Sequence, residues 1–252
     1  MGLLSKYRFF WKTEAPAKLY WQYPLFSLRR RLSKTADREV NSKMSIELDG
    51  RGQFSSRFFD GNAAQWIQVF EREQLCEKRL NMLEIGSWEG RSTVFLMHYF
   101  PGAKITCVDT WKGSDEHVGD ESLKSVEERF DVNVTRFGER VRKFKGTSLQ
   151  FFSGTDLTEK YDLVYVDGSH HADDVMCDVL NAFRCLKPNG IMICDDYLWD
   201  WYPNVRHNPA MAINYLLRQK KGECEILNVT GTQITIKKLD LDKRFTGTGS
   251  IS

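Results

Sequence analysis

The stretch Leu83-Glu84-Ile85-Gly86-Ser87-Trp88-Glu89-Gly90-Arg91-Ser92 joins a short apolar run to a helical pattern. Its two glycines, four residues apart, allow a tight turn in which backbone N–H groups approach a ligand at the start of the helix. A second apolar run ends at Asp109, where a carboxylate can accept both hydroxyls of a ribose. Together these two signals predict a nucleoside site across the ends of two neighbouring strands.

The bulk of Trp88 restricts which nucleoside this turn can take. A dinucleotide site needs the pattern G-x-G-x-x-G, in which the middle glycine lets a pyrophosphate approach the backbone. Trp88 occupies that position here, which argues against NAD or FAD. A nucleoside without a pyrophosphate remains compatible, with a carboxylate group near Ser92 at the helix N-terminus. A dinucleotide-dependent oxidoreductase is kept as a rival interpretation.

Apolar runs alternate with helical patterns from residue 60 onward. This alternation is typical of an α/β protein whose parallel sheet is covered by helices on both faces. We predict a doubly wound sheet of seven strands, with the last strand made antiparallel by a closing hairpin. The predicted strands are Asn81–Ile85, Lys104–Val108, Arg140–Phe144, Tyr161–Val166, Gly190–Cys194, Glu225–Val229 and Gln233–Lys237. The predicted helices begin at Asp60 and then cover Arg91–Phe100, Asp120–Phe137, Ser148–Phe152, Ala172–Leu186 and Pro209–Lys220.

Polar residues follow the fourth and fifth predicted strands directly. Asp167 ends the fourth strand, and Asp195 and Asp196 end the fifth. Neighbouring carboxylates repel one another unless a proton or a cation joins them, and oxygen ligands suit Mg²⁺, Mn²⁺ or Ca²⁺. His170, three residues after Asp167, can take a proton from a substrate hydroxyl near neutral pH. Ordinary turn and cap roles for these aspartates are the alternative.

The charge is unevenly distributed along the 252 residues. Residues 1–34 hold eight basic residues against one acidic residue, a charge of +7, which leaves −5 for the rest of a chain with a net charge of +2. The same segment contains eight aromatic residues. This composition predicts peripheral contact with an anionic membrane surface. A helical arm packed on the body or on a second copy is the alternative, and the acidic body argues against nucleic acid.

The other compositional signals predict a cytoplasmic protein, with a possible place at the membrane surface. No apolar stretch is long enough for a transmembrane helix. The six cysteines form no C-x-x-C pair, so we expect reduced thiols. We divide the chain into a basic aromatic extension and linker (1–59), one domain (60–238) and a tail (239–252). Residues 35–59 are polar and contain glycine, which favours a linker or cover.

With these motifs in place, residues 60–238 resemble the class I S-adenosylmethionine-dependent methyltransferases, which have a Rossmann-like sheet. They are most similar to metal-dependent O-methyltransferases of small molecules, including macrolide sugar O-methyltransferases and, more distantly, catechol O-methyltransferase. The motifs that carry the resemblance are Leu83–Gly90, Val108–Trp111, Gly146–Ser148, Asp167–His170 and Asp195–Tyr197.

The resemblance implies a role for each matching residue. Cofactor-binding positions are Glu84 and Gly86 beside the methionine part, Ser92 near its carboxylate, Asp109 on the ribose, and Trp111 and Ser148 flanking the adenine. Ser87 and Gly90 of the same turn are also expected to bind the cofactor. Asp167, Asp195 and Asp196 match the ligands of a divalent cation, Mg²⁺ or Mn²⁺. Asp167 and His170 are the candidate catalytic residues, and His170 replaces the lysine base of catechol O-methyltransferase. Ala172 stands where the sugar-modifying relatives usually have tyrosine.

The expected activity is transfer of a methyl group from S-adenosylmethionine to a hydroxyl of a sugar, glycan or glycolipid. Aromatic residues in the segment Tyr197–Pro203 favour a sugar because rings stack on its apolar face. A catechol-like acceptor, a metal-independent methyltransferase and a non-catalytic cofactor-binding module remain alternatives. A homo-oligomer is compatible with the sequence.

Overall fold

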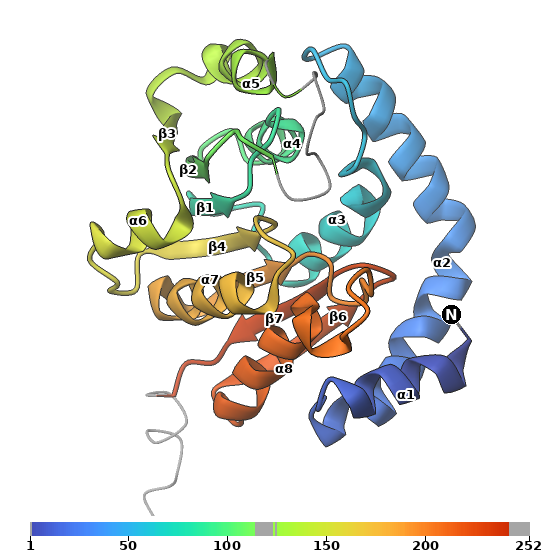
Figure 1. The fold of residues 1–252 in the computed structure, drawn as a ribbon. Helices are drawn as coiled ribbons and strands as arrows, with labels where there is room; N and C mark the ends of the chain where they lie inside the picture. The colour runs from blue at the N-terminus through green and yellow to red at the C-terminus, as the bar shows by residue number, and fades with distance from the viewer. Residues whose placement is uncertain (1, 114–122, 124, 242–252) are drawn as a thin grey trace, which may run out of the picture.

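The computed structural model describes residues 2–113, 123 and 125–241 (Figure 1). Within these residues, seven strands form one sheet in the order β3-β2-β1-β4-β5-β7-β6. The strands are β1 (Asn81–Ile85), β2 (Lys104–Asp109), β3 (Val141–Lys145), β4 (Tyr161–Val166), β5 (Leu186–Cys194), β6 (Cys224–Val229) and β7 (Ile234–Lys238). The predicted doubly wound α/β sheet is therefore confirmed.

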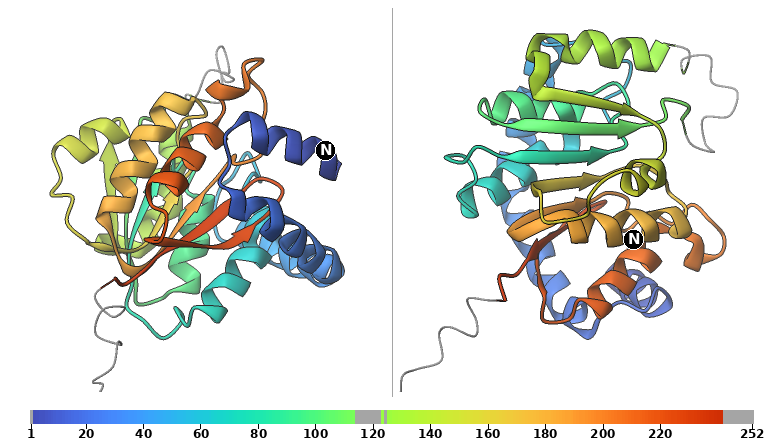
Figure 2. Two further views of the ribbon diagram at one scale, coloured as in Figure 1. Left: turned by 90° about the horizontal axis from the view of Figure 1, so that it is seen from below. Right: turned by 90° about the vertical axis from the view of Figure 1, so that its left-hand side faces the viewer.

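The directions of the strands determine which edge of the sheet carries the candidate site. Strands β1 to β5 pair in parallel, so their carboxyl ends lie at one edge (Figure 2). Strand β7 is antiparallel to both β5 and β6, as predicted for the last strand. The strand order reverses between β1 and β4, where ligands bind in sheets of this kind. Because β7 runs the opposite way, its first residues also reach this edge.

Helices cover both faces of the sheet. One apolar core joins α6 (Ser148–Ser153), α7 (Ala172–Cys185) and α8 (Pro209–Gln219) to strand residues such as Leu83 and Ile85. The other joins α3 (Ala63–Arg72), α4 (Arg91–Tyr99) and α5 (Val126–Val134) to residues such as Met82. The alternation of Met82 and Leu83 between cores follows from the two-residue period of a strand. Part of the predicted helix Asp120–Phe137, residues 120–122 and 124, lies outside the described residues.

The N-terminal segment forms two helices at the β6 edge of the sheet (Figures 1 and 2). These are α1 (Leu3–Lys12) and α2 (Ala17–Asp49), and residues 35–49, expected to be a linker or cover, are helical. The segment from Leu25 to Asp49 contains no glycine or proline, so nothing interrupts the helix once it packs. The aromatic residues Phe9, Phe10 and Tyr23 are buried in the core shared with α7 and α8. The inner face of this segment therefore packs on the body.

A buried hydrogen-bond chain ties α1 to the site edge. The Asn214 amide of α8 donates to the Thr13 carbonyl oxygen at 3.1 Å, and its Oδ1 accepts from the Tyr197 hydroxyl at 2.8 Å. Tyr197 follows Asp196 directly and is fully buried. The end of α1 thus supports the segment that leaves β5. Among the described residues, none of the helices combines the length and apolarity needed to cross a membrane.

Candidate active site

The turn after β1 is pressed against the loop after β4. Gly86 has φ +83°, and a Cβ at this position would lie 1.8 Å from the carbonyl oxygen of Asp167. No residue but glycine fits such a contact. Gly90, at φ +78°, is the N-cap of α4, and a Cβ at this position would lie 3.0 Å from the Phe130 ring. The predicted cofactor turn and the predicted metal loop are therefore in direct backbone contact.

Asp109 holds this turn from the end of β2. Its Oδ2 accepts hydrogen bonds from the backbone N–H groups of Ser87 and Trp88, each at 2.8 Å. Its Oδ1 accepts from the N–H of Trp111 at 2.6 Å. A carboxylate oxygen can accept two bonds, so Oδ1 retains one acceptor direction for a ribose hydroxyl. The ribose-binding role stays a prediction, and the structure adds a role in shaping the turn.

Glu84 and Ser92 face each other inside the protein. The Ser92 hydroxyl donates to Glu84 Oε1 at 2.5 Å, and the Thr93 hydroxyl donates to Glu84 Oε2. Glu84 is fully buried, and this burial raises the pKa of its carboxyl. Both residues lie at the predicted cofactor end of the sheet. Their side chains are engaged with each other, so their contact with a ligand remains a prediction.

The two residues predicted to flank an adenine lie in the loop after β2 and at the start of α6. Trp111 is buried against Phe130, with ring centroids 4.9 Å apart, and the Lys143 amine lies 4.6 Å from its centroid. Its indole N–H donates to the Trp88 carbonyl oxygen at 2.8 Å. Ser148 is the first residue of α6 and lies near the buried Asp178 of α7. No contact between Trp111 and Ser148 is described.

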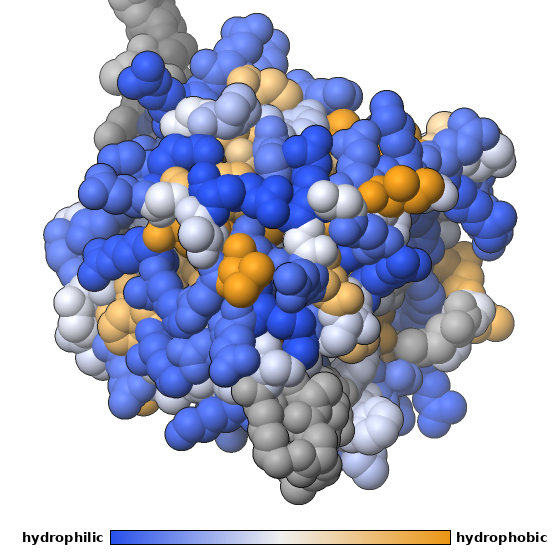
Figure 3. Space-filling model, turned by 90° about the horizontal axis from the view of Figure 1, so that it is seen from above, coloured by the Kyte–Doolittle hydropathy of each residue, from blue (hydrophilic) through white to orange (hydrophobic). Residues whose placement is uncertain are grey.

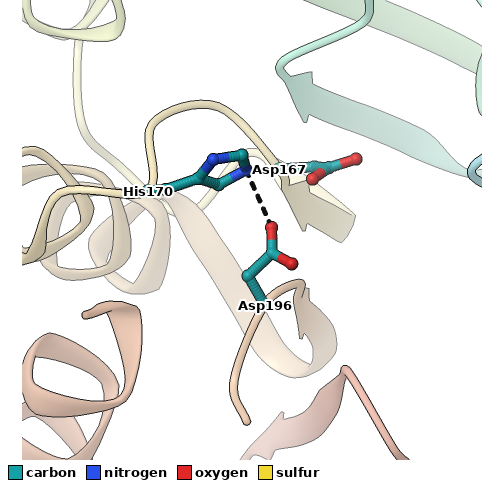
Figure 4. Close-up of side chains that lie close together, drawn as sticks. All are labelled: Asp167, His170 and Asp196. Atoms are coloured by element: carbon teal, nitrogen blue, oxygen red, sulfur yellow. Dashed lines mark ion pairs between the residues drawn. The ribbon is translucent and has the colours of Figure 1, made fainter. Parts of the chain in front are cut away.

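Three predicted site residues converge at the ends of β4 and β5 (Figure 4). One ligand atom each from Asp167, His170 and Asp196 lies within 4.8 Å of the others. His170 Nε2 is 2.9 Å from Asp196 Oδ2, which is the ion pair drawn in Figure 4. Asp196 has φ +54°, an uncommon conformation for a non-glycine residue that turns its side chain toward this group. We call Asp167, His170 and Asp196 the carboxylate–imidazole group.

Asp195 lies beside this group and faces a different partner. Its Oδ2 accepts from the Tyr165 hydroxyl at 2.5 Å and from the Gln233 amide at 2.6 Å. The same hydroxyl lies 2.7 Å from Asp167 Oδ2. One hydroxyl proton cannot serve both carboxylates, and burial together with the neighbouring carboxylates raises the pKa of Asp167 well above its usual value. The pKa of Asp195 is raised for the same reasons.

This excess of acidic groups shows whether the residues of the site could hold a cation. Three carboxylates within two residues of two strand ends carry more negative charge than one imidazole can balance. Carboxylate oxygens form a donor set that suits Mg²⁺ or Mn²⁺. The residues present therefore fit a divalent cation. Of the predicted ligands, Asp167 and Asp196 lie together with His170, whereas Asp195 is one hydroxyl away.

Tyr165 and Gln233 were not identified from the sequence. Tyr165 lies inside β4 two residues before Asp167, so the two side chains point to the same face of the sheet. Gln233 immediately precedes β7, whose antiparallel direction brings it to the carboxyl edge. A hydroxyl within the apolar run Leu163–Val166 was the available signal for Tyr165. The position of Gln233 depends on strand order and carried no local signal.

The aromatic segment after β5 divides into a buried and a site-facing part. Tyr197 is fully buried in the core. Trp199 lies 4.6 Å from the His170 ring and stacks at 6.0 Å on Trp201, which is 67% exposed. Tyr202 stacks on His171, with ring centroids 4.3 Å apart. A wall of rings therefore borders the carboxylate–imidazole group on one side.

Comparison with known proteins supports the resemblance drawn from the sequence. Residues 83–197 match a family described as a methyltransferase domain, and this stretch contains every predicted site residue. No curated protein is similar enough in sequence to be recognised as a relative.

Solved structures share the fold at low sequence identity. A Staphylococcus aureus protein assigned as a caffeoyl-CoA O-methyltransferase has a TM-score of 0.52 and 16% identity, covering 84% of this chain and 98% of that chain. A Klebsiella pneumoniae protein assigned as an O-methyltransferase has a TM-score of 0.52 and 15% identity over 80% and 90% of the two chains. MycE, from the mycinamycin biosynthetic pathway, has a TM-score of 0.55 and 17% identity, covering 84% of this chain and 57% of that one.

Proposed function

From the match of residues 83–197 to a methyltransferase domain, we propose that this protein methylates a hydroxyl of a sugar, glycan or glycolipid with S-adenosylmethionine and a divalent cation. The observation that carries the proposal is the backbone contact between Gly86 and Asp167. It puts the cofactor turn and the carboxylate–imidazole group next to each other. A methyl donor on one and an acceptor hydroxyl on the other would meet between them.

The residues of the cofactor turn hold and orient the donor. S-adenosylmethionine supplies an electrophilic methyl group on a sulfonium. The backbone N–H groups at the start of α4 and the retained acceptor of Asp109 suit its carboxylate and ribose. Trp88 and Gly90 shape the turn, and Trp88 excludes a pyrophosphate by its bulk. MycE was solved with Mg and S-adenosylhomocysteine, which supports this pairing of groups.

The carboxylate–imidazole group positions and deprotonates the acceptor. A divalent cation held by Asp167 and Asp196, with Asp195 in support, would lower the pKa of an acceptor hydroxyl and fix its place. A neutral imidazole that donates Nε2–H to Asp196 carries no hydrogen on Nδ1. Nδ1 would then accept the proton of the acceptor hydroxyl. Asp196 thereby sets the orientation and tautomer of His170. His170 acts as the general base in this proposal.

The ring wall of Trp199, Trp201 and Tyr202 favours a sugar acceptor. Aromatic faces bind the apolar face of a pyranose, and two adjacent hydroxyls suit cation chelation. The MycE complex with mycinamycin VI supports a glycosylated acceptor. The caffeoyl-CoA-type relative keeps a catechol-like acceptor as the second candidate. Both acceptor classes offer vicinal oxygens, so the ring wall is the feature that separates them.

The test is transfer of labelled methyl groups to diol sugars and to catechols, assayed side by side with Mn²⁺ or Mg²⁺. We expect sugar methylation, its loss with EDTA, and a loss of about a hundredfold or more in kcat for His170→Ala. Asp196→Asn should lower activity as well, and the exposed Asp156→Asn serves as the matched control.

Each other outcome contradicts one part of the proposal. Catechol turnover without sugar turnover would reject the sugar acceptor. Activity that survives EDTA would reject the cation. Tight binding of S-adenosylhomocysteine with no turnover of either acceptor class would point to a non-catalytic module.

A further inference from the structure

The outward face of α2 carries an apolar stripe. Large hydrophobic side chains recur there at intervals of four, three and four residues, which is one face of a helix. They are Trp21, Leu25, Leu28 and Leu32, with exposed fractions of 62%, 53%, 54% and 80%. The residues that pack on the body, Leu19, Tyr23 and Phe26, fall on the opposite face. The stripe therefore points away from the protein.

Helix α1 repeats this arrangement next to α2. Leu4 and Trp11 are exposed, at 85% and 74%, whereas Phe9 and Phe10 are buried. Leu4, Arg8 and Trp11 lie on one face at helical spacing, and all three are exposed. We call the exposed residues of both helices, Leu4, Arg8, Trp11, Trp21, Leu25, Leu28, Arg29, Arg31 and Leu32, the outer face of α1 and α2. On each helix, exposed Trp and Leu side chains are accompanied by exposed arginines.

The charge of this surface has one sign. Between residues 15 and 36 the chain has five basic and no acidic residues. Arg29 and Arg31 are exposed on either side of the leucine stripe. Apolar centres bordered by Arg and Lys bind where hydrocarbon and anionic headgroups meet, with Trp at headgroup level. Figure 3 gives a contrast, because the face seen there is mostly hydrophilic and its hydrophobic side chains are scattered.

We propose that the outer face of α1 and α2 docks this protein on an anionic lipid leaflet. The stripe supplies apolar burial at the acyl boundary, and the arginines supply attraction to lipid phosphate. Because the binding is peripheral, it needs no membrane-spanning helix. The same helix α1 lies beside the segment after β5, through Thr13 and Asn214, so docking would bring the candidate active site close to the lipid surface.

A second copy of the chain is the rival occupant. Two α2 helices that met across the stripe would bring the arginines of both copies together, and residues 15–36 offer no carboxylate to balance them. Like charges brought together across an interface are unfavourable. An anionic leaflet meets the same arginines with opposite charge. Charge complementarity therefore selects the leaflet over the second copy.

The test is cosedimentation of the full chain, without cofactor or acceptor, with phosphatidylcholine vesicles that contain or lack phosphatidylglycerol. We expect binding to the anionic vesicles that weakens with salt, and little binding to neutral ones. The double variant Arg29→Glu with Arg31→Glu should lower the partition coefficient about tenfold or more. The triple variant Leu25→Ser, Leu28→Ser and Leu32→Ser should lower it by a similar factor, about tenfold.

Matched controls are Lys78→Glu with Lys104→Glu for charge and Val132→Ser for exposed apolar area, all at exposed positions outside α1 and α2. The arginine variant changes exposed side chains alone, so it keeps the test valid if the leucine variant folds poorly. Absence of vesicle binding, equal binding to neutral vesicles, or equal loss in the controls would overturn the proposal. So would a dimer in size-exclusion chromatography that the leucine variant converts to a monomer. Vesicle binding does not depend on methyl transfer, so this result and the activity assay stand separately.

Discussion

Asp178 shows how one buried group makes stability depend on pH. It lies on α7, is 1% exposed, and its Oδ1 has no hydrogen-bond partner among the described residues. Burial is the largest cause that raises its pKa, from 3.8 to about 7, and the nearby Asp174 adds to the rise. Because the folded state holds this proton more tightly than the unfolded state, the protonated carboxyl stabilises the fold at low pH. That stabilisation is lost as pH rises toward 7.

The Asp178→Asn variant tests this linkage. An amide cannot ionise, so the variant should lack the penalty that the carboxylate imposes above pH 7, which is about 4 kcal/mol at most. We expect the Tm of the variant relative to wild type to rise as the pH goes from 5 to 8, measured by thermal unfolding at each pH. Asp173→Asn, an exposed neighbour on the same helix, is the control. A constant Tm difference across this range would contradict the assignment.

At the scale of elements, the N-terminal helices act as part of the domain. Arg91, the first residue of α4, donates to Asp49 of α2 at 2.9 Å and to Asp60 Oδ1 at 2.5 Å. Glu89 of the cofactor turn accepts from the Ser55 N–H at 2.7 Å. Residues 49–60 thus hold the predicted cofactor turn from outside the sheet. The end of α2 and the loop after it therefore contribute to the geometry of the site.

The buried hydrogen-bond chain through Asn214 predicts how strongly α1 is held on the body. Asn214→Ala removes the partner of the Thr13 carbonyl oxygen and leaves the buried Tyr197 hydroxyl unpaired. We expect the free energy of unfolding to fall by about 1–3 kcal/mol, measured by denaturant titration. Asn181→Ala, which removes only a hydrogen bond to the Cys177 carbonyl oxygen within α7, should lower the free energy of unfolding by less. Equal losses of unfolding free energy in the two variants would show that the hydrogen bonds of Asn214 have no special role.

Across the whole molecule, cation binding should report on the fold of the site edge. Addition of Mn²⁺ should raise the Tm of the wild type, because an ion that binds the folded state stabilises it. The gain should shrink as the pH is lowered, since the raised pKa values of Asp167 and Asp195 mean that protons compete with the ion. Asp196→Asn should abolish the gain, and Asp156→Asn should retain it. An equal Mn²⁺ effect in both variants would place the ion elsewhere.

Local pattern anticipated most of the sheet and part of the site. The bounds predicted for Asn81–Ile85 and Tyr161–Val166 match β1 and β4, because short, mostly apolar runs and adjacent turns are local signals. The predicted strand Gly190–Cys194 covers only the second part of β5, whose pairing with β4 jumps from Leu186 to Ile191. The helix continues over residues 35–49 because Asp37 and Leu48 pack on the body. The polar composition of this segment gives no sign of that burial.

Composition, strand–helix alternation and the glycine turn were enough to predict the fold class, the antiparallel last strand and the site edge. Those properties follow from periodicity and backbone freedom, which act over a few residues. Three-dimensional packing grouped Asp167 and Asp196 with His170, turned Asp195 toward Tyr165 and Gln233, and exposed the stripe on α2. Each of these depends on residues far apart in the chain, so the order of the strands and the choice of buried helix face determine them.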